Sequence, residues 1–445
     1  MNDTNFAQNH PAKPLEDVVH GLIYLYILTI PFQALWFRLI GLSIGIPEIV
    51  FIILVPLAII HIMCSGQKLW IDRLDLFVFG WLATNILTGW HAGFDSVVIT
   101  EIIKTAYLVV LYAILKWTIT PEMITRIGEI IILSSLIAAI TGILGFGLGY
   151  FGIDNTLSIT RPFPYLIENV TQAKGFTPTP NMLASIIMIG IFFQIHKIYN
   201  NRKLYTSNIL LFVTLMIGFL VTFSKTIVCL LIGITLIWYF HNKPKLSLTL
   251  QTVTKIAVAG LFIAYIFGTH FIIVEKDQDF ELLKGDYIAG PVLIETANYS
   301  IYPSQYWSLN EISFEAINQS FPWGLGPGKF NDYAHELKKN DAYPTHVPYP
   351  DPHSTYLGTL AEIGLLGLIT FFGIIFFVIK FSRKILSNHA ADQNMFTSLP
   401  TVFIVIGIEA ISTDVMNFRH YWILLILLVS TFQNLKSTSS KSLNL

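Results

Sequence analysis

His353, a histidine that could take part in catalysis, lies where a polar segment with two prolines (350–356) meets an apolar run with regularly placed glycines (360–368). A titratable imidazole at the edge of an apolar helix is unfavourable unless it is paired or used. Two interpretations are open. The residue is either a solvated histidine at a membrane interface or a group that binds or deprotonates a substrate.

Basic residues are the second chemical feature of the chain. The apolar segments between these basic residues should cross the membrane in alternating directions. This predicts that the basic residues lie on one side of the molecule. They can meet only if the helices surround a cavity, and a cavity lined by cations suits a polyanion such as a diphosphate. Alternatively, the helix ends carry scattered basic residues. The set comprises Arg161, Lys174, Lys225, Lys329, His346, His353, Arg419 and His420.

Other ionisable groups favour structural roles. Glu101 and Lys104 are three residues apart in an apolar segment, a spacing that favours an ion pair within one helix. Glu48 begins another apolar segment and is interpreted as a helix-entry residue. Cys64 and Cys229 lie inside apolar runs, so they predict neither a disulfide nor a zinc site. No metal and no other cofactor is expected.

The composition indicates an integral membrane protein. Of the 445 residues, 53% are hydrophobic and only 12% are charged, which is more apolar material than one soluble core uses. A formal net charge of -1 gives no reason to expect a nucleic-acid partner. The start of the chain has no basic region and no small-residue cleavage site, so no removable signal peptide is expected.

Apolar windows of about 20 residues recur along the whole chain and predict an all-α polytopic membrane protein with about twelve transmembrane helices. The lipid bilayer is therefore a partner. The predicted spans are 18–38, 47–64, 74–90, 98–117, 127–149, 182–198, 207–223, 226–241, 253–274, 356–380, 396–414 and 418–435.

Lysines and arginines concentrate in alternate short connections, which the positive-inside rule assigns to the cytoplasm. Both termini are then cytoplasmic, and one large loop between the ninth and tenth helices lies on the far, periplasmic side of the membrane. The chain divides accordingly into helices one to nine (1–274), the large loop (275–352), and helices ten to twelve with a cytoplasmic tail (353–445).

The large loop is rich in aromatic residues. One interpretation is a belt at the membrane interface, and another is a platform on which sugar rings stack. The loop also contains an amphipathic stretch, 312–320, followed by a glycine-rich turn, 324–328. Its aromatic residues are Tyr299, Tyr302, Tyr306, Trp307, Trp323, Tyr333, Tyr343 and Tyr349.

Four motifs follow one another along the chain. They are a Gly-to-Pro-Asn-x-Leu-Ala entry into a span at 175–184, a Ser-Lys pair at 224–225, a Phe-Pro-Trp-Gly-Leu-Gly-Pro-Gly-Lys-Phe run at 321–330, and a His-Ser-Thr-Tyr to Glu-x-Gly element at 353–367. Together they resemble motifs of the O-antigen ligase and polymerase family of bacterial membrane glycosyltransferases, in which the third motif reads Pro-x-x-Gly-x-Gly. Each is weak alone, but their order and spacing with the spans and the late loop make the set fairly specific.

The resemblance implies transfer of a glycan from an undecaprenyl-diphosphate carrier to an acceptor sugar hydroxyl, without nucleotide sugar or metal. The acceptor would be lipid A-core or a growing polysaccharide at the periplasmic face of the bacterial inner membrane. His353 would act as general base or position the hydroxyl in an inverting displacement. The diphosphate would be bound by Lys225, Arg161, Lys174 and Lys329. Supporting residues would be Ser354, Tyr356, Glu362, Gly364, Gly326, Asn181 and Ser224.

The chain departs from the family pattern at the donor site. Family members usually have an arginine after the serine of the short turn and another early in the large loop. Here Lys225 takes the first position, and Tyr306 and Trp307 lie near the second. Lysine keeps the charge but lacks the two-pronged geometry of guanidinium. Arg161, Lys174 or Lys329 could compensate.

Alternatives remain open at this stage. A polymerase of O-antigen or exopolysaccharide repeat units differs mainly in the acceptor, and a protein-glycosylating relative would be expected to carry a further soluble domain. A secondary transporter or flippase would use Glu101, Lys104 and Asp414 as coupling charges, but no matched pair of interrupted helices is visible. A non-catalytic assembly scaffold would have no use for a basic cavity.

Overall fold

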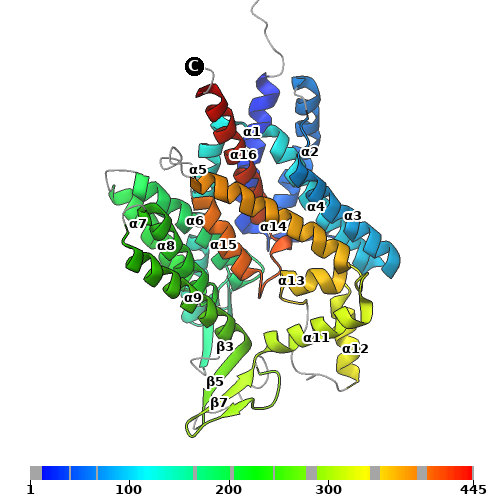
Figure 1. Cartoon of the computed structure of the whole chain (residues 1–445), viewed down its shortest axis with the longest axis vertical. Helices are drawn as coiled ribbons and strands as arrows, with labels where there is room; N and C mark the ends of the chain where they lie inside the picture. The colour runs from blue at the N-terminus through cyan, green and yellow to red at the C-terminus, as the bar shows by residue number, and fades with distance from the viewer. Residues whose placement is uncertain are drawn as a thin grey trace, which may run out of the picture.

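The computed structural model describes residues 13–39, 42–66, 69–163, 168–200, 205–243, 246–276, 288–340, 351–387 and 398–442. In this part the chain is mainly helical (Figure 1). The elements are α1 Lys13–Thr29, η1 Ile30–Phe32, β1 Trp36–Leu39, β2 Leu42–Gly45, α2 Ile46–Ser65, α3 Arg73–Ala92, α4 Ser96–Thr118, α5 Pro121–Tyr150, β3 Ser158–Phe163, β4 Glu168–Ala173, α6 Pro180–Asn200, α7 Thr206–Leu220, α8 Thr226–Asn242, α9 Leu248–His270, β5 Phe271–Glu275, β6 Ile294–Glu295, β7 Tyr299–Pro303, α11 Gln305–Ser320, α12 Phe330–Lys339, α13 Thr355–Gly358, η3 Thr359–Ile363, α14 Gly364–Ser387, α15 Leu399–Glu409, η6 Val415–Asn417 and α16 Arg419–Ser442.

The chain has an all-α polytopic membrane fold, as expected. Within the described residues, seven helices are long and apolar enough to cross a membrane, and α7, α8 and α15 are shorter apolar helices. A helix overlaps each of the twelve predicted spans, but the number that cross the bilayer stays a prediction. The first span was predicted too long: helix α1 ends at Thr29, and a 3-10 turn containing Pro31 follows, because proline lacks the N–H that would continue an α-helix.

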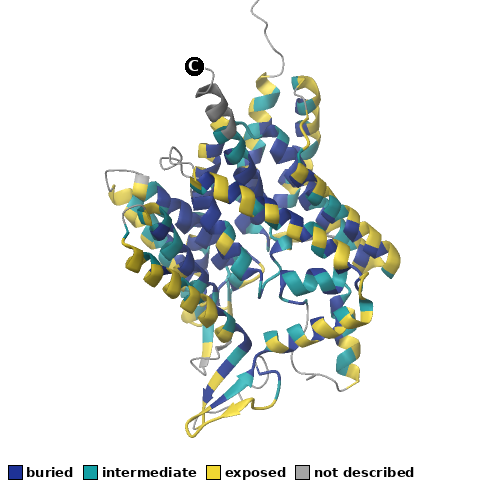
Figure 2. Cartoon of the chain, viewed as in Figure 1, coloured by how far each residue is buried: buried dark blue, intermediate teal, exposed yellow. Residues whose placement is uncertain are grey.

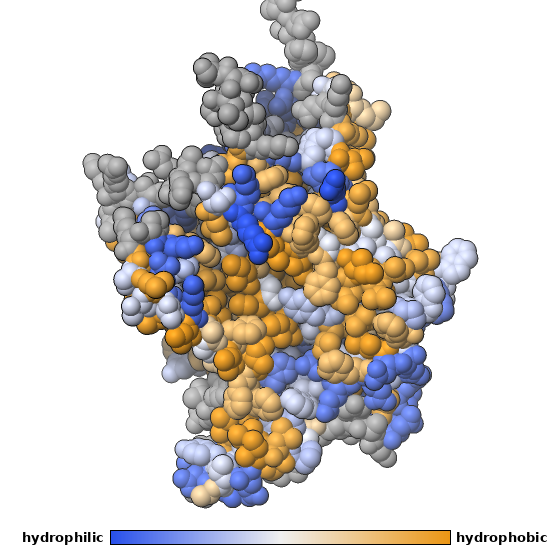
Figure 3. Space-filling view, viewed as in Figure 1, coloured by the Kyte–Doolittle hydropathy of each residue, from blue (hydrophilic) through white to orange (hydrophobic). Residues whose placement is uncertain are grey.

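Large apolar side chains are exposed along the outer helices, as a lipid-facing surface requires. Met63 of α2, Leu210 of α7 and Ile263 of α9 are between 66% and 78% exposed. Buried residues concentrate in the middle of the bundle (Figure 2), where Tyr421–Val429 of α16 are almost fully buried. The space-filling view shows apolar residues over the middle of one face and more polar residues toward both ends (Figure 3).

The large loop forms a small structured cap. Strands β5, β7 and β6 pair antiparallel in that order, and helices α11 and α12 pack together through Leu309, Ile312 and Phe330. The predicted amphipathic stretch 312–320 is part of α11. This cap lies at the end of the molecule opposite the start of α1 and the end of α16 (Figure 1).

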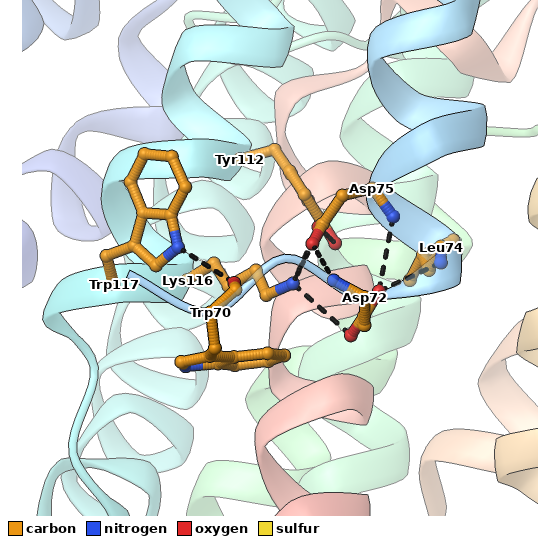
Figure 4. Close-up of polar contacts among 7 residues, drawn as sticks. All are labelled: Trp70, Asp72, Leu74, Asp75, Tyr112, Lys116 and Trp117. Atoms are coloured by element: carbon orange, nitrogen blue, oxygen red, sulfur yellow. Dashed lines mark hydrogen bonds and ion pairs between the residues drawn. The ribbon is translucent and has the colours of Figure 1, made fainter. Parts of the chain in front are cut away.

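A buried ion pair joins α3 to α4 away from the cap (Figure 4). The ammonium of Lys116 lies 2.5 Å from Oδ2 of Asp75, and both side chains are 1% exposed. Asp72 adds a carboxylate at 3.2 Å, and the Tyr112 hydroxyl donates to Asp75 at 2.9 Å. The Lys116 ammonium also lies 3.7 Å from the centroid of the Trp70 ring. Each buried charge therefore has polar partners, which a buried ion requires.

Candidate active site

A cavity of about 1220 Å³ opens between the helical bundle and the cap. Residues from segments far apart in the chain line it, including the β3–β4 hairpin, the α7–α8 turn, α11 and the segment before α13. Most of the predicted site residues meet here. They are His353, Lys225, Arg161, Lys174, Asn181, Ser224 and Glu362.

His353 is held by a carboxylate two residues earlier in the chain. Oδ1 of Asp351 accepts the backbone N–H of His353 at 2.7 Å and also contacts its Nδ1. A carboxylate at Nδ1 favours the tautomer with the proton on that nitrogen, which leaves Nε2 as an acceptor. The φ angle of His353 is 46°, a left-handed conformation that a non-glycine residue rarely adopts. Such backbone strain is common at functional sites.

The residues after His353 anchor it to the connection between α15 and α16. The hydroxyl of Thr355 donates to the carbonyl of Thr413 at 2.8 Å and accepts the N–H of Val415 at 2.9 Å. The Tyr356 hydroxyl donates to the carbonyl of Gly407 at 2.8 Å. The hydroxyl of Ser354 caps helix α13. Ser354 and Tyr356 therefore support the histidine rather than line the large cavity.

The α7–α8 turn presents Lys225 to the cavity. The Ser224 hydroxyl donates to Oδ1 of Asn181 at 2.8 Å, so the entry to α6 holds the turn. Phe223, two residues before Lys225, has a φ of 47°; among the described residues, it and His353 are the non-glycine residues with positive φ. Burial lowers the pKa of the Lys225 ammonium to about 7.

The β3–β4 hairpin brings two further cations to the same wall. Nε of Arg161 donates to Oε1 of Gln172 on the paired strand at 2.8 Å, which fixes the guanidinium. Lys174 follows β4, and the N–H of Ala173 donates to the carbonyl of Val221 at 2.9 Å. The hairpin is thus tied to the turn that carries Lys225, and the three cations share one side of the site.

Tyr306 of α11 lies between the cationic wall and the histidine. Its ring centroid is 3.4 Å from the Lys225 ammonium and 5.5 Å from the His353 ring centroid. Burial raises the pKa of the Tyr306 phenol to about 12, so the hydroxyl stays protonated near neutral pH. Sequence reasoning noted this residue as one of the aromatic residues of the large loop and as a departure from the family pattern, and not as a site residue.

The cavity lining also carries carboxylates, namely Glu101, Asp351, Glu362 and Asp414, and it includes Lys104 beside Glu101. Burial and the neighbouring Asp351 raise the pKa of Asp414 to about 7. Glu101 forms its predicted ion pair with Lys104 at 2.5 Å. The lining therefore contains both cations and carboxylates, and His353 contacts one of these carboxylates, Asp351.

The glycine-containing run 321–330 and the Glu-x-Gly segment of the 353–367 element bind one another directly through their backbones. The N–H groups of Leu325 and Gly326 donate to the carbonyls of Ala361 and Glu362 at 2.8 and 2.9 Å. A Cβ on Gly324 would lie 2.5 Å from the Glu362 carbonyl, and one on Gly364 would lie 2.3 Å from the Pro322 carbonyl. Both glycines also have positive φ. This close approach of two backbones requires residues without side chains.

The side chain of Glu362 adds a further hydrogen bond between the same two segments. Its Oε1 accepts the N–H of Phe330 at 3.1 Å, at the start of α12. Residues 359–363, which include Glu362, form a π-helical turn, a local form that is frequent at functional sites. The glycine loop and the Glu-x-Gly segment therefore act as one unit that fixes the cap to the entrance of α14.

The structure does not bring every predicted cation to the cavity. The Lys329 ammonium pairs with Asp95 and, at 3.0 Å, with Asp332, and it does not line the cavity. These pairs raise the pKa of Lys329. Two carboxylates thus already neutralise it, and a donor role for Lys329 has no support in the geometry.

Arg419 and His420 also lie elsewhere. The Arg419 guanidinium binds Glu48, Gln33 and the Tyr107 hydroxyl, which ties α16 to α2, to the end of η1 and to α4. Glu48 in addition accepts the N–H of Gly45 at 2.9 Å, as expected of a helix-entry residue. His420 is buried beside Ser185. His346 falls outside the described residues.

Sequence reasoning missed Asp351 as a site residue. The signal available was its position two residues before His353, within reach of the imidazole. Ser412 was also missed: its carbonyl lies 3.5 Å from the Lys225 ammonium, and its hydroxyl hydrogen-bonds Tyr265 at 2.6 Å. No spacing rule in the sequence indicates a contact across 187 residues.

A family model described as O-Antigen ligase matches residues 210–372. This stretch contains Lys225, Tyr306, Asp351 and His353, and it ends within α14. No curated protein matches the chain.

Proposed function

We propose that this chain, whose residues 210–372 match a family model described as O-Antigen ligase, transfers a glycan from an undecaprenyl-diphosphate carrier to a hydroxyl of a lipid A-core sugar. The observation that carries this proposal is one cavity whose lining brings together a carboxylate-oriented His353, a wall with three cations, and further carboxylates.

The basic wall suits the diphosphate of the donor. Lys225, Arg161 and Lys174 offer charge-assisted hydrogen bonds to phosphate oxygens. Apolar residues continue the lining beside them, including Phe146, Phe219 and Val228. A ligand that joins a charged head to a long apolar chain matches this combination, and a polyprenyl diphosphate is such a ligand.

The transfer can proceed in one displacement. Nε2 of His353 takes the proton of the acceptor hydroxyl as its oxygen forms a bond to the anomeric carbon of the donor sugar. The bond from that carbon to the diphosphate oxygen breaks, and the electron pair leaves with the diphosphate. The basic wall stabilises the departing charge. Attack opposite the leaving group inverts the anomeric configuration.

The carboxylates of the lining suit a hydroxyl-rich acceptor, because carboxylate oxygens accept hydrogen bonds from sugar hydroxyls. Asp414 lines the cavity, and Glu101 does so together with its partner Lys104. A repeat-unit polymerase would use the same carboxylates for the end of a growing chain, so the acceptor assay distinguishes the two activities.

The proposed site faces the periplasm, with the enzyme in the bacterial inner membrane and both termini in the cytoplasm. Two observations support this orientation. The short connections rich in lysine and arginine alternate with poorly charged ones. The cap lies at the end of the molecule opposite the described ends of α1 and α16 (Figure 1).

Reconstitution tests the function directly. The full chain in lipid nanodiscs is given undecaprenyl-diphosphate-linked glycan with lipid A-core, or with a second donor molecule as the sole acceptor. Glycan on lipid A-core supports the ligase, and chain extension on the donor alone supports the polymerase. No product with either acceptor, from protein that is folded by size-exclusion chromatography, would contradict the proposal.

A further inference from the structure

Tyr306 is fixed firmly with respect to the membrane helices. The Ser304 hydroxyl caps α11 by accepting the N–H of Tyr306 at 3.2 Å, and it donates to the carbonyl of Thr269 at 2.6 Å. One turn further along α11, the Asn310 amide lies 2.8 Å from Nε2 of His270. The end of α9 therefore determines where the Tyr306 ring stands.

The ring is the main partner of Lys225. Its centroid lies 3.4 Å from the ammonium, within the range of cation–π interactions. Among the described residues, this ammonium also donates to the Ser412 carbonyl, at 3.5 Å. Among the described residues, no carboxylate forms an ion pair with Lys225, whereas Lys329 has two.

The kind of partner decides what the lysine can still bind. A carboxylate cancels the charge of an ammonium and competes with phosphate for it. An aromatic face attracts the cation but carries no net charge, so a diphosphate meets an ammonium that is still uncompensated.

We propose that Tyr306 is a positioning residue of the donor site, whose ring holds the Lys225 ammonium in the cavity until the diphosphate of a lipid-linked donor binds it. The inference rests on the proposed function. On this proposal, the aromatic ring of Tyr306 keeps Lys225 charged and correctly placed.

The charge of Lys225 gives a readout that a purely structural role would leave unchanged. The groups that face it are Arg161 of β3, Cys229 of α8, His270 of α9, Tyr306 of α11 and Glu409 of α15. Burial disfavours the charged form, and the ring favours it. Loss of the ring should therefore move the pH at which donor affinity declines to a lower value.

A double-mutant cycle tests the pair. The affinity of the full chain in detergent for undecaprenyl diphosphate is measured for the parent, Tyr306→Leu, Lys225→Met and the double variant. We expect Tyr306→Leu to weaken binding by about 2- to 30-fold in the parent and by less than about twofold beside Lys225→Met. Tyr306→Phe keeps the ring and should bind like the parent.

Trp307→Leu is the matched control, because it removes the neighbouring aromatic residue of α11, which does not line the cavity. It should leave donor affinity unchanged. Equal losses from Tyr306→Leu in both backgrounds, or an unchanged pH dependence, would overturn the proposal. If the folded parent binds no undecaprenyl diphosphate, the proposed donor is itself wrong.

Discussion

Oδ1 of Asp351 accepts the backbone N–H of His353 at 2.7 Å and contacts Nδ1 of the same residue. One carboxylate therefore fixes both the backbone conformation and the ring orientation of the histidine. The contact explains how a residue with a φ of 46° is held in the cavity. It also predicts which nitrogen is free to take a proton.

Asp351→Asn should lower the rate of transfer by up to about 10⁴-fold, since an amide in this place no longer favours the required tautomer. Donor affinity should change little, because the cationic wall is intact. The measurement is the initial rate with donor and acceptor near saturation. Asp332→Asn is the control, because that carboxylate is exposed and pairs with Lys329 outside the cavity. Equal rates for the two variants would remove Asp351 from the mechanism.

Lys225→Ala should weaken donor binding by about 10- to 150-fold, corresponding to loss of a charge-assisted hydrogen bond of about 1.5 to 3 kcal/mol. Lys225→Arg should keep or improve binding, because a guanidinium matches phosphate geometry. Donor titrations of transfer rate distinguish the variants. A Lys225→Ala protein with the parental rate at limiting donor would make Lys225 a mere flanking residue.

Donor affinity should decline as the pH rises through about 7. The lowered pKa of Lys225, about 7, means that its ammonium is charged below this pH and neutral above it. Asp414, with its pKa raised to about 7, becomes negative over the same range and adds repulsion. Lys225→Arg should flatten the profile more than Asp414→Asn does. An identical profile for Lys225→Arg and parent would contradict this assignment.

The fold itself makes a stability prediction. Lys116→Met removes one partner of the buried pair with Asp75 and should destabilise the protein by about 3 to 5 kcal/mol. Lys104→Met breaks a pair on the same helix whose lysine is 56% exposed, and it should cost no more than about 1 kcal/mol. Denaturant unfolding in detergent measures both. Similar losses would mean that burial does not govern the strength of these pairs.

The orientation can be tested with single cysteines in a background that lacks Cys64 and Cys229. Asn298→Cys is on the exposed edge of the cap, and Ser247→Cys is at the start of α9. A membrane-impermeant thiol reagent added to spheroplasts should label the first and not the second. The reverse pattern would turn the site toward the cytoplasm and exclude a periplasmic reaction.

Local patterns in the sequence predicted the helices well, because an apolar window long enough to span lipid is a property of neighbouring residues. The end of α1 shows the limit, since the apolar composition continues to residue 38 while Pro31 stops the helix. The meeting of His353, Lys225 and Arg161 was expected from the order of motifs and the side of the membrane, which restrict where each loop can lie.

Contacts between residues far apart in the chain could not be predicted from local sequence patterns. Lys329 resembled a free cation until the fold placed Asp95, 234 residues away, against it. The two glycine motifs were recognised separately, but nothing local indicated that the backbones at Gly324 and Gly364 touch. The place of Tyr306 between Lys225 and His353 likewise depends on how α11 is fixed to the end of α9.

The rate of glycan transfer by His353 variants tests the central claim most directly. A general base contributes about 10²- to 10⁴-fold, so His353→Ala should lose at least that factor while folding normally. His353→Gln should be similarly slow, because an amide can orient a hydroxyl but cannot take its proton. His335→Ala, at an exposed position of α12, is the control and should transfer at the parental rate. Parental rates in both His353 variants, scored as product on the acceptor, would contradict the account.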